Sequence, residues 1–368
     1  MARTPLGQRL PDFPWDSLAD AKATASAHPD GIVNLSVGTP VDEVAPSIQL
    51  ALAESASLSG YPQTVGTPEL REAIVSWLAR RYSIDTLTAD AVLPVIGTKE
   101  AIAWLPTLLG ANGQVVIPEV AYPTYEVGAL LAGASVLRSD SLMRIGPGRP
   151  DLIFINSPSN PTGKVLGLDH LRKVVEFARS RDVIIASDEC YLGLGWNDDN
   201  PPLSILDPRV TDGDNTNLIA IHSLSKSSNL ASYRVGFLAG DQALISELLE
   251  VRKHAGLMVP GPIQGAMTAA LQDDDQEQLQ RLRYARRRAV LLPALLRAGF
   301  QVDESEAGLY LWATRGEDCR ATVDWLAERG ILVAPGDFYG PRGRQHIRMA
   351  LTGSDERIDA AAARLAQS

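Results

Sequence analysis

The chain has 368 residues, with 34 lysines and arginines against 44 aspartates and glutamates, so its formal net charge is −10. A chain of this length exceeds what one compact core usually holds, which predicts two domains or two lobes of unequal size. The negative charge repels phosphate backbones and anionic membranes, so neither a nucleic acid nor a membrane is expected as a partner.

Cysteine and histidine are both rare in the chain. The two cysteines, Cys190 and Cys319, predict neither a disulfide framework nor a zinc site. The five histidines show no ligand spacing, so no bound metal is expected. The first 18 residues contain three prolines and no continuous apolar stretch, which argues against a signal peptide. The sequence contains no run of about 18 apolar residues, so no membrane span is expected. A cytoplasmic protein is expected.

Short apolar runs alternate with helical patterns from about residue 70 onward. Apolar residues at helical spacing predict helices over residues 69–81, 99–109, 125–131 and 169–179. Strands are predicted over residues 91–96, 114–117, 135–137, 152–156, 183–187, 218–222 and 236–239. Several of these runs are almost continuously apolar, as expected for parallel strands that are buried on both faces. Repeated strand–helix–strand units therefore predict an open α/β sheet.

The sequence after residue 240 predicts more helix and then a second α/β unit. A long helix is expected over residues 276–298, with a solvated basic face that includes Arg287, and the acidic triplet at 273–275 is expected to be a polar loop. Strands at 300–302, 309–313, 331–334 and 346–350, with a helix at 320–329, predict a smaller lobe. We expect a large domain at 46–275 and a small one at 276–368, to which residues 1–45 contribute.

Several catalytic motifs are absent from the sequence. It contains no Walker loop, no HExxH, no paired CxxC, no GxSxG and no GxGxxG. Their absence excludes most hydrolases, metalloenzymes and dehydrogenases, but not an enzyme that holds its cofactor through a lysine.

The strongest candidate site follows the strand predicted at residues 218–222. Ser223, Ser225 and Lys226 come directly after its apolar part, and Arg234 follows eight residues later. Hydroxyl groups and a fork-shaped guanidinium are suitable donors for a phosphate group. A lysine among them can form an imine with an aldehyde. The alternative is a polar edge between strand and loop with an exposed lysine.

This stretch resembles the S-x-S-K-(x)7-R-x-G signature of class I and II aminotransferases, the fold-type I enzymes that depend on pyridoxal 5′-phosphate (PLP). The resemblance implies an α/β fold with a large domain, built on a mostly parallel seven-stranded sheet, and a smaller α/β domain. It also implies that Lys226 holds PLP as an imine and shuttles a proton. Ser223, Ser225 and Arg234 would hold the phosphate.

Two further motifs follow strands, at the sheet edge where α/β proteins bind ligands. Asp188 resembles the aspartate that pairs with the pyridine nitrogen of PLP, and Tyr191 the tyrosine that hydrogen-bonds its O3′. Asn160, in an Asn-Pro-Thr-Gly tetrapeptide, resembles the asparagine that contacts O3′ and the substrate. Taken alone, Asp188 could instead cap a helix, and the tetrapeptide could be an ordinary turn.

The remaining cofactor contacts implied by the resemblance lie earlier in the chain. Gly97, Thr98 and Lys99, where a strand runs into a helix, resemble a second phosphate cradle. Tyr122 resembles the aromatic residue that stacks on the pyridine ring, with core packing as its alternative. Tyr61 resembles the tyrosine that reaches the cofactor phosphate of a neighbouring subunit, which implies a homodimer with shared active sites.

The resemblance also implies a substrate site. Arg348 resembles the arginine that grips the substrate α-carboxylate with two parallel hydrogen bonds, and Gly38 the glycine whose backbone touches the same carboxylate. The similarity extends over roughly residues 30 to 360, with the motifs in the family's order. It implies a ping-pong transfer of an amino group between an amino acid and a 2-oxo acid.

The opening of the chain and the segment at residues 335–340 resemble bacterial N-succinyldiaminopimelate aminotransferases of lysine and diaminopimelate biosynthesis. This implies N-succinyl-LL-2,6-diaminopimelate and 2-oxoglutarate as substrates, with Lys99 as a hypothetical partner of the distal carboxylate. The alternatives are an aspartate, alanine or aromatic aminotransferase, a PLP-dependent C–S lyase, and a PLP-sensing regulatory domain. The last is disfavoured because no residues remain for a DNA-binding segment.

Overall fold

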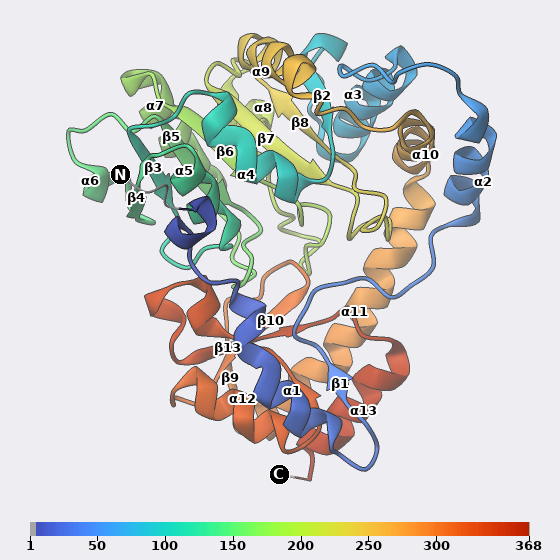
Figure 1. The fold of residues 1–368 in the computed structure, drawn as a ribbon, viewed down its shortest axis with the longest axis vertical. Helices are drawn as coiled ribbons and strands as arrows, with labels where there is room; N and C mark the ends of the chain where they lie inside the picture. The colour runs from blue at the N-terminus through green and yellow to red at the C-terminus, as the bar shows by residue number, and fades with distance from the viewer. Residues whose placement is uncertain (1–4, 368) are drawn as a thin grey trace.

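The computed structural model, which describes residues 5–367, contains a seven-stranded sheet in the larger of two lobes (Figure 1). All its strands run parallel except β8, which is antiparallel to both of its neighbours. Each strand ends within one residue of its predicted bounds, and the predicted, mostly parallel sheet is confirmed. The strands, in their order across the sheet, are β2 (Val92–Val95), β8 (Gly236–Gly240), β7 (Leu218–Ser223), β6 (Ile184–Asp188), β5 (Leu152–Asn156), β3 (Gln114–Ile117) and β4 (Ser135–Arg138).

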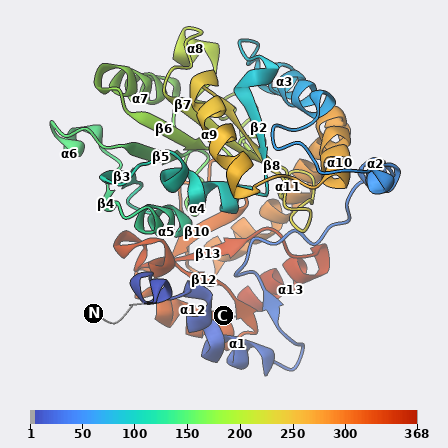
Figure 2. The ribbon, with the colours of Figure 1, turned by 45° about the horizontal axis from the view of Figure 1, so that its top comes forward.

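Helices cover both faces of this sheet. Successive strand residues point to opposite faces: Ile219 and Ile221 of β7 pack in one apolar cluster with α4, α5 and α9, whereas Leu218 and Ala220 pack in another with α3, α7 and α10. Figure 2 shows α4 and α9 lying over the sheet. The helices of this lobe are α2 (Pro46–Glu54), α3 (Pro68–Tyr82), α4 (Thr98–Leu108), α5 (Thr124–Leu131), α6 (Leu142–Ile145), α7 (Leu168–Arg181), α8 (Pro208–Thr211), α9 (Gln242–Ala255) and α10 (Gly261–Gln272).

The smaller lobe contains an antiparallel sheet in the order β12 (Ala334–Pro335), β13 (His346–Ala350), β10 (Tyr310–Thr314), β9 (Gln301–Asp303). The helices α1 (Ala19–Ser26), α12 (Cys319–Ala327) and α13 (Asp355–Leu365) share its apolar core. The single strand predicted at 331–334 is wrong. This segment contains two short strands, because β11 (Ile331–Leu332) pairs with β1 (Val33–Asn34) whereas β12 pairs with β13. The division at residues 45 and 275 stays a prediction.

Helix α11 (Asp274–Arg297) runs from the larger lobe into the smaller one (Figure 1). The prediction of an acidic loop at 273–275 is wrong. The Asp273 side chain caps α11 by accepting a hydrogen bond from the Gln276 N–H, and the next two aspartates lie in the first helical turn. Carboxylates there stabilise the helix through its dipole. The basic face is not fully solvated either. Arg287 is buried, because Asp42 and Asp355 pair with it.

Short 3-10 helices complete the fold at Leu6–Arg9, Pro14–Leu18, Ser55–Ser57, Ala89–Ala91, Gly336–Tyr339 and Pro341–Gly343. Within residues 5–367, no helix combines the length and the apolar character that crossing a bilayer requires.

Candidate active site

The predicted site residues gather where the carboxyl ends of β5, β6 and β7 face the smaller lobe. Asn156 and Asp188, the last residues of β5 and β6, are partners in the sheet register, and Ser223 ends β7. Side chains of the smaller lobe reach this edge: Arg348 of β13 bonds to Asn160, and Tyr310 of β10 bonds to Tyr191. Parallel pairing thus brings together motifs that are far apart in the sequence.

Lys226 lies in the middle of this group. Its side chain is half-buried, and its Nζ donates a hydrogen bond to the carbonyl oxygen of Gly38. Burial lowers the pKa of the Lys226 amine, since the charged form loses hydration. A larger share of the amine is therefore neutral than in water, and only a neutral amine can act as a nucleophile or accept a proton.

Asp188 is a buried carboxylate at the end of β6. The Tyr125 hydroxyl donates to its Oδ2 at 2.6 Å, and the Cys190 N–H donates to its Oδ1 at 3.2 Å. Burial raises the pKa of Asp188, although these hydrogen bonds oppose the shift. Among the described residues, no lysine or arginine forms an ion pair with it. A cationic group such as a protonated ring nitrogen would therefore meet an uncompensated carboxylate here.

A second part of the site has the character of an anion cradle. The Arg234 guanidinium packs on Gly97, and a Cβ at residue 97 would collide with it. Gly97 also has φ +77°, a conformation that favours glycine. Directly after it, Thr98 begins α4, so free backbone N–H groups point out of this helix start. At the end of β7, the Ser225 N–H donates to the Ser223 hydroxyl at 3.2 Å.

Lys99 departs from this cradle. It is exposed, and its Nζ lies 5.6 Å from the ring centre of Phe13, in the N-terminal segment. The neighbouring Trp15 ring lies 6.0 Å from the guanidinium carbon of Arg348. Residues 13–15 therefore run between the helix start of the larger lobe and β13 of the smaller lobe.

Arg348 is buried on the small-lobe side of the site. Its Nη1 donates to Asn160 Oδ1 at 3.0 Å, its Nη2 donates to the Ser36 carbonyl at 2.6 Å, and its Nε has no partner. The Tyr310 ring lies 3.9 Å from its guanidinium carbon. Arg348 thus has donor capacity in reserve for an anionic group, and the carbonyl of Gly38 lies in the segment that follows Ser36.

Tyr122 and Tyr61, both predicted to contact the cofactor, differ in their position relative to the cluster at the sheet edge. The Tyr122 ring lies nearly perpendicular to Tyr125, with 5.8 Å between ring centres, and burial raises its pKa to about 12. It therefore stands beside the tyrosine that bonds to Asp188. Tyr61 is 96% exposed, so it is not part of the cluster that the other residues form within one chain.

Sequence reasoning missed Tyr125, Tyr310 and Trp15. Tyr125 lies in the first turn of α5, only three residues after Tyr122, and the two rings lie 5.8 Å apart. That spacing was a usable signal. No local spacing in the sequence points to Tyr310 or Trp15, because only tertiary packing brings β10 and the N-terminal segment to this edge.

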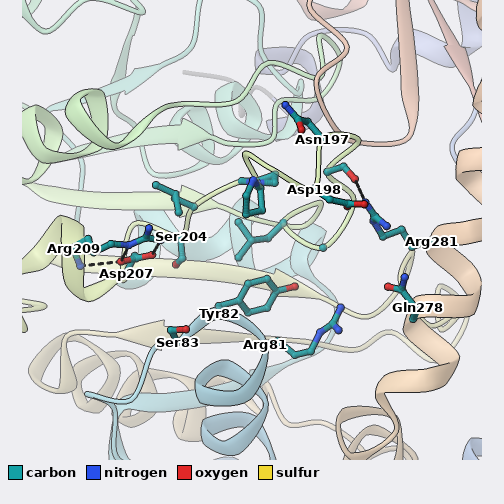
Figure 3. Close-up of a pocket in the computed structure, with 16 residues that line it drawn as sticks. Arg81, Tyr82, Ser83, Asn197, Asp198, Ser204, Asp207, Arg209, Gln278 and Arg281 are labelled. Carbon is teal, nitrogen blue, oxygen red and sulfur yellow. Dashed lines mark hydrogen bonds and ion pairs between the residues drawn. The ribbon is translucent and has the colours of Figure 1, made fainter.

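A separate hollow lies between the end of α3, the loop after β6 and α11 (Figure 3). None of the predicted site residues lines it. Its arginines already lie close to carboxylates: Arg209 bonds to Asp207 at 2.6 Å, and Arg281 bonds to Asp198. The reactive groups are therefore at the sheet edge and not in this hollow.

The groups at the sheet edge fit PLP. Buried Asp188 lacks a cation, the surroundings of Arg234 and Gly97 suit a phosphate, and Lys226 is a desolvated amine between them. This combination, on an α/β sheet with a second lobe closing over its edge, is that of a fold-type I PLP-dependent enzyme.

Comparison with known proteins agrees with the geometry. The sequence model of the family described as aminotransferase class I and II matches residues 30–365, and the chain belongs to this family of PLP-dependent aminotransferases. A probable aminotransferase of Mycobacterium tuberculosis is 67% identical, over 99% of this chain and 87% of that protein. The 4-dedimethylamino-4-oxo-anhydrotetracycline transaminase of Streptomyces rimosus is 53% identical, over 97% of this chain and 99% of that protein. The structure of a probable N-succinyldiaminopimelate aminotransferase from Thermus thermophilus superposes with a TM-score of 0.86 at 25% identity, covering 96% of this chain and 100% of that one.

Proposed function

We propose that this aminotransferase exchanges an amino group between N-succinyl-LL-2,6-diaminopimelate and 2-oxoglutarate, as a step of lysine and diaminopimelate biosynthesis. The observation that carries the proposal is a pair of cations at different depths: buried Arg348, and exposed Lys99 near the N-terminal segment. One suits an α-carboxylate, and the other suits a distal carboxylate such as that of a succinyl group. The printed name of the Thermus thermophilus neighbour supports the same substrate.

The proposed roles of the cofactor-site residues are those that the family resemblance implies. Asp188 pairs with the ring nitrogen, Tyr191 and Asn160 contact the ring oxygen O3′, and Tyr122 stacks on the ring. The phosphate is held by the cradle, which consists of Gly97, Thr98, Ser223, Ser225 and Arg234, with Lys99 contributing only its backbone N–H at the start of α4. Bound PLP supplies an electron sink for the carbon next to the reacting nitrogen. Asp188 keeps the ring nitrogen protonated, because its buried carboxylate has no other cation.

Lys226 is proposed to bind the cofactor and to carry the proton in the reaction. Its lowered pKa makes the free amine a base that takes the α proton of the substrate and returns a proton to the cofactor side. Arg348 and the Gly38 backbone hold the α-carboxylate and so orient the α carbon toward Lys226. The Gly38 carbonyl accepts a hydrogen bond from the Lys226 amine, so only the Gly38 N–H can donate to the carboxylate.

We also propose a cytoplasmic homodimer with shared active sites. Exposed Tyr61 has two apolar neighbours in the same segment, Leu50 and Leu58, which are 59% and 61% exposed. Large exposed apolar side chains in one segment favour an interface with a second copy of the chain. In the dimer, Tyr61 would reach the phosphate of the partner's cofactor.

A second candidate function is the amination of a bulky cyclic ketone. The 53% identical relative is named for a tetracycline substrate. Trp15, whose ring lies 6.0 Å from the Arg348 guanidinium carbon, packs against Phe338 with 5.0 Å between ring centres and against Phe13 with 6.0 Å. Flat rings of this kind suit a large aromatic substrate as well as an acyl chain.

The test is a panel of amino donors with and without the succinyl group, combined with two variants. Lys226→Ala should abolish both turnover and the visible absorbance of the lysine-bound cofactor. Lys99→Ala should raise the KM of the succinylated donor and leave that of alanine unchanged, while Lys173→Ala, another exposed lysine, serves as control. Equal use of the free and succinylated donors would refute the proposed substrate. Release of pyruvate or ammonia from the donor, in place of pyridoxamine phosphate formation, would indicate a lyase.

A further inference from the structure

Tyr310 is a buried tyrosine of β10 that touches several of the proposed site residues at once. Its hydroxyl lies 3.2 Å from the Tyr191 hydroxyl, and its ring lies 3.9 Å from the guanidinium carbon of Arg348. The hydroxyl also occupies the space that a Cβ of residue 38 would need, so only glycine fits at Gly38 beside it. Tyr310 is 4% exposed, and these contacts place its hydroxyl inside the site.

The small sheet holds Tyr310 in this position. Tyr310 pairs with Ala350 and Trp312 with Arg348 in the antiparallel register of β10 and β13. Tyr310 and Arg348 are therefore diagonal neighbours on one face of the sheet, within reach of each other's side chains. The rings of Tyr310 and Tyr191 meet edge to face at 77°, with 5.8 Å between their centres. Packing thus fixes both rings before any ligand binds.

Counting protons gives the direction of the bond between the two hydroxyls. Each tyrosine hydroxyl carries one proton and can accept two hydrogen bonds. If Tyr191 gives its proton to the ring oxygen of the cofactor, it has none left for Tyr310. The bond at 3.2 Å must then be donated by Tyr310.

The charges around the two phenols favour this direction. Burial alone would raise the pKa of Tyr310, but the positive charges of Arg348 and Lys226, together with the hydrogen bond to Tyr191, outweigh it, and the pKa is lowered. For Tyr191, burial dominates and raises the pKa well above its usual value. The more acidic phenol is the better donor, and that phenol is Tyr310.

We propose that Tyr310 is a positioning residue whose hydroxyl donates to Tyr191 and so directs the Tyr191 proton to the ring oxygen of the bound cofactor. The inference rests on the role proposed above for Tyr191. Bonds in such a chain strengthen one another, so Tyr310 makes Tyr191 a stronger donor and stabilises negative charge on the ring oxygen.

The test uses the cofactor-loaded protein and Tyr310→Phe, which removes the hydroxyl and keeps the ring over Arg348. The readout is the pH midpoint of the visible absorbance change of the bound cofactor. With a weaker donor, the ring oxygen holds on to a shared proton up to higher pH, so the midpoint should rise. Loss of one neutral hydrogen bond predicts a rise of roughly 0.5 to 1 pH unit. The KM of the amino donor should stay unchanged, because Arg348 keeps its aromatic neighbour.

Tyr339→Phe is the matched control. Tyr339 is also a buried tyrosine near Arg348, with its ring 5.2 Å from the guanidinium carbon, but its hydroxyl has no partner. Its removal should leave the midpoint in place. Tyr191→Phe should raise the midpoint, and adding Tyr310→Phe to it should cause no further rise, since the chain is already broken.

Each outcome is decisive. If Tyr191→Phe raises the midpoint and Tyr310→Phe behaves like Tyr339→Phe, the role of Tyr310 is refuted while that of Tyr191 stands. An additive rise in the double variant also refutes the chain of bonds. An unmoved midpoint in Tyr191→Phe refutes the role of Tyr191 and, with it, that of Tyr310.

Discussion

Replacing Arg348 with lysine tests the proposed substrate site while keeping its positive charge. The guanidinium donates to Asn160 at 3.0 Å and to the Ser36 carbonyl at 2.6 Å, and its Nε has no hydrogen-bond partner. A lysine ammonium offers a single nitrogen in place of a planar fork. It therefore cannot hold both of these acceptors and also bind a carboxylate with two parallel hydrogen bonds.

The size of the effect follows from the bonds lost. A hydrogen bond to a charged group contributes about 1.5–3 kcal/mol, and leaving a buried acceptor unpaired costs about 1–3 kcal/mol. Losing one of two carboxylate bonds in Arg348→Lys therefore predicts a fall in kcat/KM of roughly 10- to 150-fold at 1.36 kcal/mol per tenfold change. The free energy of unfolding should fall as well, because Asn160 or Ser36 loses its partner.

Steady-state kinetics with glutamate and the succinylated donor measure the fall, and urea unfolding measures the stability. Arg364→Lys is the control, since Arg364 is a buried arginine of α13 that donates to the Gly330 carbonyl at 2.8 Å. It should lower stability and leave kcat/KM unchanged. If kcat/KM of Arg348→Lys falls by less than about threefold, the loss is smaller than the roughly 1.5 kcal/mol expected of one charged hydrogen bond. That result would refute the assignment of Arg348 to the carboxylate.

Two further predictions concern stability. Arg287→Met leaves Asp42 without its 2.6 Å partner and should cost about 3–5 kcal/mol of unfolding free energy. Arg286→Met, at a side chain that is 61% exposed, should cost about 0–1 kcal/mol, and equal urea midpoints for the two variants would contradict the difference. Burial raises the pKa of Glu189 to about 7 from the 4.5 of a free glutamate. The folded protein therefore holds a proton that the unfolded chain releases, and stability falls as pH rises from 4.5 to about 7. Glu189→Gln should remove this fall in a pH series of urea midpoints. Burial lowers the pKa of neighbouring His222 to about 3, which acts in the opposite direction, and identical pH profiles for the two proteins would contradict the prediction.

Local pattern explains why the large lobe was predictable. Strands such as β3 and β5 are short apolar runs bounded by polar residues, and hydrophobic burial on both faces suffices to form them. The prediction for residues 331–334 was wrong because the first half of this segment pairs with β1 and the second half with β13, which no local pattern encodes. The prediction that Arg287 is solvated was wrong for a similar reason, since its two carboxylate partners lie far away in the sequence.

The sequence by itself determined the fold class and the groups that line the edge of the large sheet. Asp188 is the last residue of β6, Asn160 and Lys226 lie shortly after β5 and β7, and parallel pairing of these strands gives the three residues one common edge. Only the tertiary structure decided what closes over that edge. Tyr310, Trp15 and the Gly38 carbonyl come from the smaller lobe and the N-terminal segment. Their position depends on how the two lobes pack, and that packing is a property of long-range contacts and not of any local stretch of chain.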